Sequence, residues 1–182
     1  GHKFHAVRGV GFVYKKAGKK ITPFLTGGGQ EKDLRSTTEN VAGIASMAKA
    51  LRLVTDKEEF SLPKIAKMKK IIFDELAKYE DITIFSGEGE DFAPNILTFG
   101  IKGVRGEVVV HAFEEHQIYI STTSACSSKA GKPAGTLISM GIPTKLAQTA
   151  VRISLDDDND MGQVEQFLTI FKQVYAKTQK VR

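Results

Sequence analysis

The chain has 182 residues and a formal net charge of +5, with 41% apolar and 26% charged residues. These totals are typical of a globular protein of one domain or slightly more. No apolar run approaches the ~18 residues of a membrane span, and the N-terminal residues lack the order of a secretory signal. We therefore expect a cytoplasmic protein without a membrane segment.

The positive charge is spread along the chain. Lysines gather at 15–20, at 64–70 and at 172–180. A dedicated nucleic-acid binder more often has one basic stripe with interleaved aromatic residues. We therefore expect an anionic cofactor or an acidic partner and no direct nucleic-acid contact, although nucleic-acid binding stays open as an alternative.

The first part of the chain predicts a strand, a loop and a helix. Residues 9–14 (GVGFVY) are apolar and β-branched, which predicts a buried strand. Residues 24–38 are polar and glycine-rich and predict an ordered loop. Small and apolar residues recur at helical spacing over 39–53, which predicts a helix. The charged stretch 55–61 predicts a link between two units.

The second part alternates helices with short strands, which is an α+β pattern. Pro63 is expected near the start of a helix that extends to residue 79, and Asp160 is expected to cap a last amphipathic helix. We predict strands at 82–85, 95–100, 117–121 and 151–155, and short helices at 106–115, 136–140 and 144–150. The predicted domains are residues 1–55 and 56–182.

Lys3 lies between His2 and Phe4, ahead of a glycine-hinged segment. A lysine amine in such a setting suits bond formation with an aldehyde, and His2 is placed to donate to a phosphate. Taken alone, the pattern also fits an ordinary surface lysine.

Residues 27–40 read GGGQEKDLRSTTEN. Exposed backbone N–H groups and the Thr38 hydroxyl ahead of a helix would suit an anion. A plain glycine loop that leads into a helix has the same pattern, so the segment alone does not decide between them.

The one cysteine, Cys126, lies in STTSACSS at 121–128 and has no partner for an intrachain disulfide. Small polar neighbours suit a thiol that must reach a substrate and then an acceptor, and Lys129 favours the thiolate. The alternative is a serine-rich loop with an exposed cysteine. Because exposed free cysteines are a liability, we favour a functional thiol.

Arg152 lies within the apolar segment VRISL at 151–155. Its charge cannot be shed, so it needs an anionic partner. That partner is either a ligand or a local acid such as Asp156. The spacing of His111 and His116 does not suit two ligands on one helix face, and the acidic run 156–160 lacks the spacing of a calcium loop, so we expect no metal site.

Four motifs in order resemble those of NifS-like cysteine desulfurases of the class V aminotransferase family. They are GHKFHAVRGVG, GGGQEKDLRSTTEN, STTSACSS and VRISL. In the family, the second motif reads Gly-Gly-Gly-Gln-Glu-Arg-Gly-(Leu/Met)-Arg-Ser-Gly-Thr-Glu-Asn, and the third is typical of the subgroup with the longer cysteine loop. The family's Gly-Pro-Lys turn is Ala6-Val7-Arg8 here. Thr37 and Thr123 stand at family glycines, so a positive φ at Thr37 would strain the loop.

The resemblance implies the C-terminal portion of a protein of pyridoxal-phosphate fold type I. Its fold class would be α/β and α+β: a remnant of the large cofactor-binding domain, followed by the small C-terminal α+β domain. Pyridoxal 5'-phosphate would be bound covalently by Lys3. His2 would contact its phosphate, and Thr38 would contact the phosphate in the neighbouring subunit, which implies a homodimer.

By the same resemblance, Cys126 takes the sulfur of L-cysteine as a persulfide and leaves alanine, while Arg152 holds the substrate carboxylate. The sulfur would pass to an acceptor protein for iron–sulfur clusters, tRNA or thio-cofactors. Family groups that contact the cofactor ring precede the lysine, so we expect a fragment that alone binds the cofactor weakly and turns over poorly. A related class V aminotransferase, a selenocysteine lyase or a non-catalytic dimerisation or sulfur-carrier module remains an alternative.

Overall fold

The computed structural model describes residues 1–89, 91–122 and 135–179. The chain divides into two compact units, Gly1–Glu59 and Phe60–Arg182. The helix α1, Val41–Leu76, extends across this division. The predicted link at 55–61 is therefore helical, and the division between the two units falls within it. Lysine and glutamate are good helix formers, and Pro63 lies inside the helix, where it removes one backbone donor.

Unit 1 contains a short 3-10 helix, η1 (His2–Phe4), and the first half of α1. Asn40 caps α1, because its Oδ1 accepts a hydrogen bond of 3.0 Å from the Gly43 N–H. A small apolar cluster holds the two helices together: Ala6, Met47 and Ala50 are buried, with Phe4 and Val10 packed against them.

The predicted strand at 9–14 is wrong. These residues have no regular secondary structure, and Phe12, Val13 and Tyr14 are 60%, 80% and 84% exposed. A strand must pair its N–H and C=O groups with a neighbouring strand. Within the part of the chain that the structure describes, every strand belongs to the sheet of unit 2, so the segment 9–14 has no such neighbour.

Unit 2 is built on an antiparallel sheet with the order β1-β2-β4-β3. Its strands are β1 (Ile82–Ile84), β2 (Ile96–Ile101), β3 (Ser121–Thr122) and β4 (Ala150–Ser154). The predictions for β1, β2 and β4 are confirmed to within two residues. The strand predicted at 117–121 is wrong over most of its length, because only Ser121 of that range pairs with β4.

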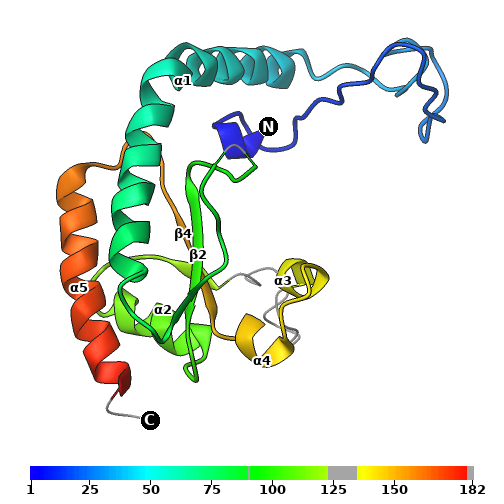
Figure 1. The fold of residues 1–182 in the computed structure, drawn as a ribbon. Coiled ribbons are helices and arrows are strands. Elements are labelled where there is room, and N and C mark those ends of the chain that lie inside the picture. The colour runs from blue at the N-terminus through cyan, green and yellow to red at the C-terminus, as the bar shows by residue number, and fades with distance from the viewer. Residues whose placement is uncertain (90, 123–134, 180–182) are drawn as a thin grey trace. The chain divides into compact units, whose positions relative to one another are not determined.

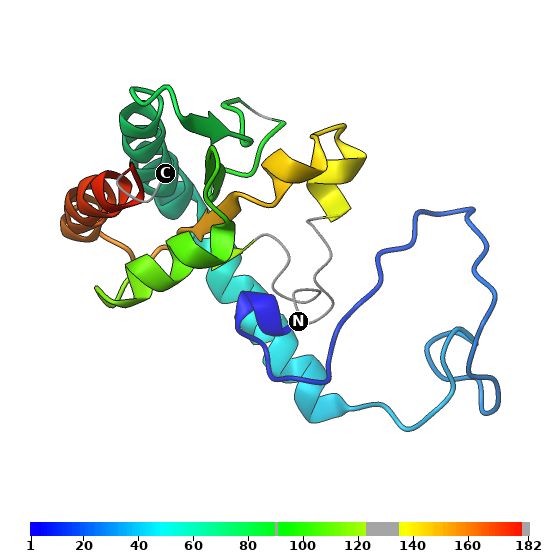
Figure 2. The same cartoon turned by 90° about the horizontal axis from the view of Figure 1, so that it is seen from below.

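The other helices that the structure describes lie around this sheet: α2 (Gly106–Glu114), α3 (Gly135–Ser139), α4 (Thr144–Ala147) and α5 (Met161–Gln179). In Figure 1, α5 and the second half of α1 lie side by side next to the sheet. Figure 2 shows α3 and α4 on the other side of the sheet from them. The predicted α+β organisation of this part of the chain is confirmed.

The core of unit 2 lies on one face of the sheet. Side chains alternate between the two faces of a strand. Leu97, Phe99, Val151 and Ile153 face a cluster that includes fully buried residues of α1, α2 and α5. Ala150 has the opposite parity on β4 and packs with Leu137 and Ala147 of α3 and α4. Among the described residues, these two short helices cover part of the second face.

The start of α5 is closed by a reciprocal pair of hydrogen bonds, as the predicted Asp160 cap required. The Gln163 N–H donates to Asp160 Oδ1 at 2.9 Å, and the Asp160 N–H donates to Gln163 Oε1 at 3.2 Å.

We expect Asp160→Ala to lower the free energy of unfolding by about 1 kcal/mol, measured by urea denaturation. Asp158→Ala is the matched control, since Asp158 is exposed and has no such role. An equal loss in both variants would contradict the capping role.

Candidate functional site

Arg152 lies on the partly covered face of the sheet. Its neighbours in β4, Val151 and Ile153, are 0% and 6% exposed and belong to the core. Since successive side chains alternate, Arg152 points to the opposite face. The strand register places Thr98 of β2 directly opposite Arg152 on one side, and Ser121 of β3 directly opposite it on the other.

The Nε of Arg152 is not satisfied by the described residues around it. It is buried and has no hydrogen-bond partner among them, and none of their carboxylates forms an ion pair with Arg152. The Asp156 carboxylate, the local acid considered above, instead accepts from the Asp157 N–H at 2.7 Å. A buried, unpaired donor costs about 1–3 kcal/mol. An anionic ligand at this position would remove that cost.

The segment that precedes Cys126 is tied to Arg152 by the sheet. Ser121 and Thr122 pair with Arg152 and Val151. Cys126 itself, like Thr123, lies outside the described residues. Because Cys126 follows Thr122 by four residues, the chain allows its Cα to lie at most ~14 Å from that of Thr122.

The loop before β2 is fixed by a buried lysine of α1. Lys69 is 6% exposed and its Nζ donates to the carbonyl oxygens of Ala93 at 2.8 Å and Gly87 at 3.3 Å. Burial lowers the pKa of Lys69, and the nearby charge of Glu88 opposes this effect in part. The bonds hold both ends of the loop against α1.

Lys3 and His2 lie in η1 of unit 1, and both side chains are exposed. Phe4 anchors this short helix in the apolar cluster with Met47 and Ala50. His5 ends it in the left-handed conformation, with φ of 68°. The structure therefore fixes the backbone around Lys3 and leaves its amine accessible.

The glycine-rich loop that leads to Thr38 contains a left-handed turn. Glu31, Lys32 and Asp33 have φ of 53°, 57° and 64°, and the Asp33 N–H donates to the Gly29 carbonyl at 3.1 Å. Thr37 does not have a positive φ, so the strain considered for it does not arise. The strained backbone lies instead at residues such as Asp33, because a non-glycine residue in the left-handed conformation costs about 1–2 kcal/mol. The sequence carries a signal for this, since the family motif has glycine at the position of Asp33.

Thr38 is exposed at the end of this loop. Gln30 Oε1 is buried and accepts no hydrogen bond from the described residues. Lys3, His2 and Thr38 belong to unit 1, and Arg152 and the segment before Cys126 belong to unit 2. Within unit 2 the sheet brings Arg152 together with the segment before Cys126.

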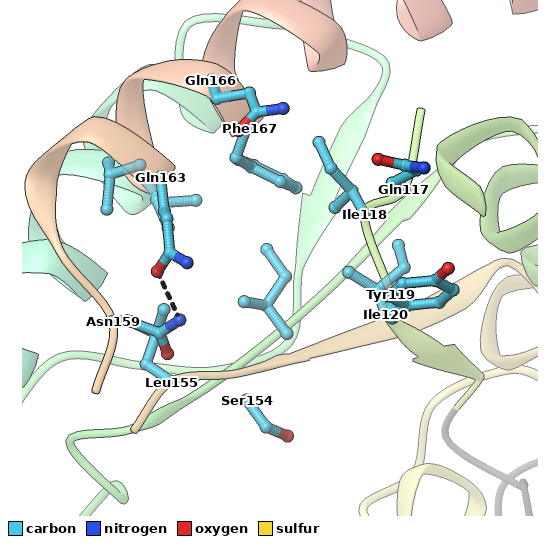
Figure 3. Close-up of a pocket in the computed structure, with 13 residues that line it drawn as sticks. Gln117, Ile118, Tyr119, Ile120, Ser154, Leu155, Asn159, Gln163, Gln166 and Phe167 are labelled. Carbon is cyan, nitrogen blue, oxygen red and sulfur yellow. Dashed lines mark hydrogen bonds between the residues drawn. The ribbon is translucent and has the colours of Figure 1, made fainter. Parts of the chain in front are cut away.

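A cavity of about 260 Å³ lies beside β4, and none of the predicted site residues lines it. It opens where residues 117–120 diverge from the end of β4, with Phe167 and Ile118 among its apolar residues (Figure 3). The Asn159 Nδ2 donates to Gln163 Oε1 at 2.8 Å at its rim. The described residues that line it include no charged side chain, so they offer no counterion to a charged amino acid.

Two kinds of feature are absent from residues 1–89, 91–122 and 135–179. No three histidine, cysteine, aspartate or glutamate side chains there come together as a metal site would require. No helix in the same ranges is long and apolar enough to cross a membrane.

Comparison with protein families gives one match that covers most of the chain. The model of the family described as aminotransferase class-V matches residues 1–167. A NifS/IcsS protein homolog of Lactobacillus delbrueckii subsp. bulgaricus is 46% identical over 180 residues, which are 99% of this chain and 47% of that protein. The cysteine desulfurase IscS of Dictyoglomus turgidum is 32% identical over 154 residues, or 85% of this chain and 39% of its own length.

Solved structures agree with these sequences. A NifS-like protein matches 96% of this chain and 44% of its own, with 30% identity and a TM-score of 0.78. A NifS-like protein from Rickettsia africae matches 87% of this chain and 41% of its own, with 32% identity and a TM-score of 0.72. The chain thus spans less than half the length of the relatives it matches, and the predicted mixed helix-and-sheet fold class is confirmed.

Proposed function

Since this chain belongs to the class V aminotransferase family, we propose that it forms the C-terminal part of a pyridoxal-phosphate-dependent cysteine desulfurase. The observation that carries the proposal is the buried Nε of Arg152, which has no partner in the described part of the chain. Arg152 also lies in register with the segment leading to Cys126. An amino-acid carboxylate at Arg152 would thereby be held within reach of the thiol. Two relatives named as cysteine desulfurases align with 85% and 97% of this chain, at 32% and 30% identity.

Arg152 binds and orients the substrate. Its planar guanidinium can pair Nε and one Nη with both oxygens of the L-cysteine carboxylate. Because the site is partly buried, such a pair is stronger than it would be at an exposed position. The substrate is thereby held with its carboxylate fixed next to β3.

Cys126 carries the sulfur. Its thiolate attacks the sulfur of L-cysteine, an S–S bond forms as the substrate C–S bond breaks, and the carbon skeleton takes the electron pair and a proton and leaves as alanine. The persulfide then passes to a sulfur-acceptor protein. Small polar neighbours suit a thiol that must first reach the substrate and then the acceptor protein.

The donors of unit 1 fit the cofactor. Lys3 offers an accessible amine for its aldehyde, and the imidazole of His2 and the hydroxyl of Thr38 are exposed donors for its phosphate. Pyridoxal 5'-phosphate supplies an electron sink when bound. Thr38 would reach the phosphate in a second copy of the chain, so we also propose a homodimer. Lys3 additionally moves the proton at the substrate Cα.

The assignment of Lys3 is tested by trapping. We expect borohydride reduction of the chain with pyridoxal 5'-phosphate to attach one cofactor predominantly at Lys3, located by peptide mass mapping. Lys3→Ala should lose this label, whereas Lys16→Ala, which removes another exposed lysine of unit 1, should keep it. Labelling spread evenly over the surface lysines would contradict a cofactor site and favour the non-catalytic alternative.

A further inference from the structure

The hydrogen-bond pattern of the sheet distinguishes the two hydroxyl residues beside Arg152. The Leu155 N–H donates to the Asn95 carbonyl at 2.9 Å. In an antiparallel pair, hydrogen-bonded and non-hydrogen-bonded positions alternate. Leu155 and Asn95 form a hydrogen-bonded pair, so Arg152 and Thr98, three residues further along the strands, form a non-hydrogen-bonded pair. The backbone N–H and C=O of Arg152 therefore point away from β2, toward β3 and Ser121.

Thr98 is held rigidly on its own side. Its N–H donates to Ser86 Oγ at 2.8 Å, and its carbonyl accepts from the Phe85 N–H at 2.8 Å. The residue is 9% exposed. Thr98 is therefore fixed and nearly buried beside Arg152, and its side chain is little accessible to a ligand.

Ser121 differs in both respects. It lies on an edge strand of two residues and is only partly buried. Among the described residues, its hydroxyl has no hydrogen bond to any other group. Its side chain shares a face with Arg152, and the Cβ atoms of such opposite pairs lie about 4.5–5.5 Å apart. A group bound at the guanidinium thus lies within reach of this hydroxyl.

We propose that Ser121 is the second ligand of the carboxylate that Arg152 binds. The guanidinium pairs with both carboxylate oxygens, and the Ser121 hydroxyl donates to a remaining lone pair of the oxygen nearer β3. This inference rests on the proposed function, since it assigns a specificity-determining residue to the same site. It also ties the edge strand to β4 through the bound ligand.

L-alanine is a suitable probe for this site, because it carries the carboxylate of the proposed product. Arg152 can present two parallel donors to that carboxylate, and Ser121 adds a donor from one side of the row only.

The test follows the Arg152 Nε–H signal in a ¹⁵N–¹H spectrum of the whole chain during titration with L-alanine. The signal is assigned by its loss in Arg152→Lys. We expect it to shift on titration, and we expect Ser121→Ala to weaken binding about tenfold, as for a lost hydrogen bond to a charged acceptor. Ser121→Thr keeps the hydroxyl and should bind within about twofold of the parent chain.

Two matched controls separate this role from a general effect on the sheet. Thr98→Val removes the hydroxyl on the other side of Arg152, and Ser154→Ala removes one further along the same face of β4; both should leave the affinity unchanged. If Arg152 responds but Ser121→Ala binds like the parent, the inference fails and the Arg152 assignment stands. If the Arg152 Nε–H signal does not shift with L-alanine in any variant, the assignment of Arg152 as the carboxylate site in the proposed function fails as well.

Discussion

Replacement of Cys126 by serine is expected to reduce alanine release from L-cysteine at least about 100-fold, because a hydroxyl is a far weaker nucleophile than a thiolate toward sulfur. No other thiol in the chain can replace it. The rate is measured on the complete gene product with the cofactor added. Mass spectrometry of the parent should also show the addition of one sulfur atom to the peptide that contains Cys126.

The Cys126→Ser variant can also be tested for cofactor binding, which the substitution should leave unchanged. Its borohydride-trapped label at Lys3 should equal that of the parent, because the substitution leaves unit 1 unchanged. Undiminished alanine release from the variant would remove the desulfurase mechanism. It would leave another class V reaction, such as that of an aminotransferase or a selenocysteine lyase, which does not need this thiol.

Substitution of Arg152 by lysine is expected to lower kcat/KM for L-cysteine about 30-fold, or roughly 2 kcal/mol of binding energy. Lysine keeps the charge but cannot pair with both carboxylate oxygens. The carboxylate is bound before and during the reaction, so most of the loss should appear in KM. Steady-state rates over a range of L-cysteine concentrations measure both constants.

Stability separates this effect from damage to the fold. Since Arg152 Nε is a buried donor that none of the described residues satisfies, its removal should not lower the melting temperature. Arg105→Lys is the matched control, because that side chain is 71% exposed and pairs with Glu107 at 3.5 Å. Equal kinetics in the two variants would contradict a substrate role for Arg152.

Much of unit 2 could be predicted because its elements have strong local patterns. Apolar segments bounded by turn residues identified β1, β2 and β4, and Asp160 identified the start of α5. The same reasoning failed at residues 9–14, where an equally apolar segment has no strand to pair with. It also failed at 55–61, because charged residues with high helix propensity look like a link when only hydrophobic spacing is considered.

The candidate site shows a similar division. Arg152 could be found from the sequence because a permanent charge in an apolar strand requires an anion. Thr98 and Ser121 could not be found, since they become its neighbours only through the register of three strands that are far apart in the chain. Asp33 and Thr37 both stand at glycines of the family motif, and the sequence alone did not show that Asp33 is the one with a positive φ.

The order of strands in the sheet also has a consequence during synthesis of the chain. β1 and β2 are neighbours in sequence and can form a hairpin as they leave the ribosome, whereas β4, the other neighbour of β2, is made only after α2, α3 and α4. Until then one edge of β2 and its apolar side chains are open to other nascent chains. Chains that end before residue 150 should therefore aggregate, and chaperone demand should fall once β4 has emerged.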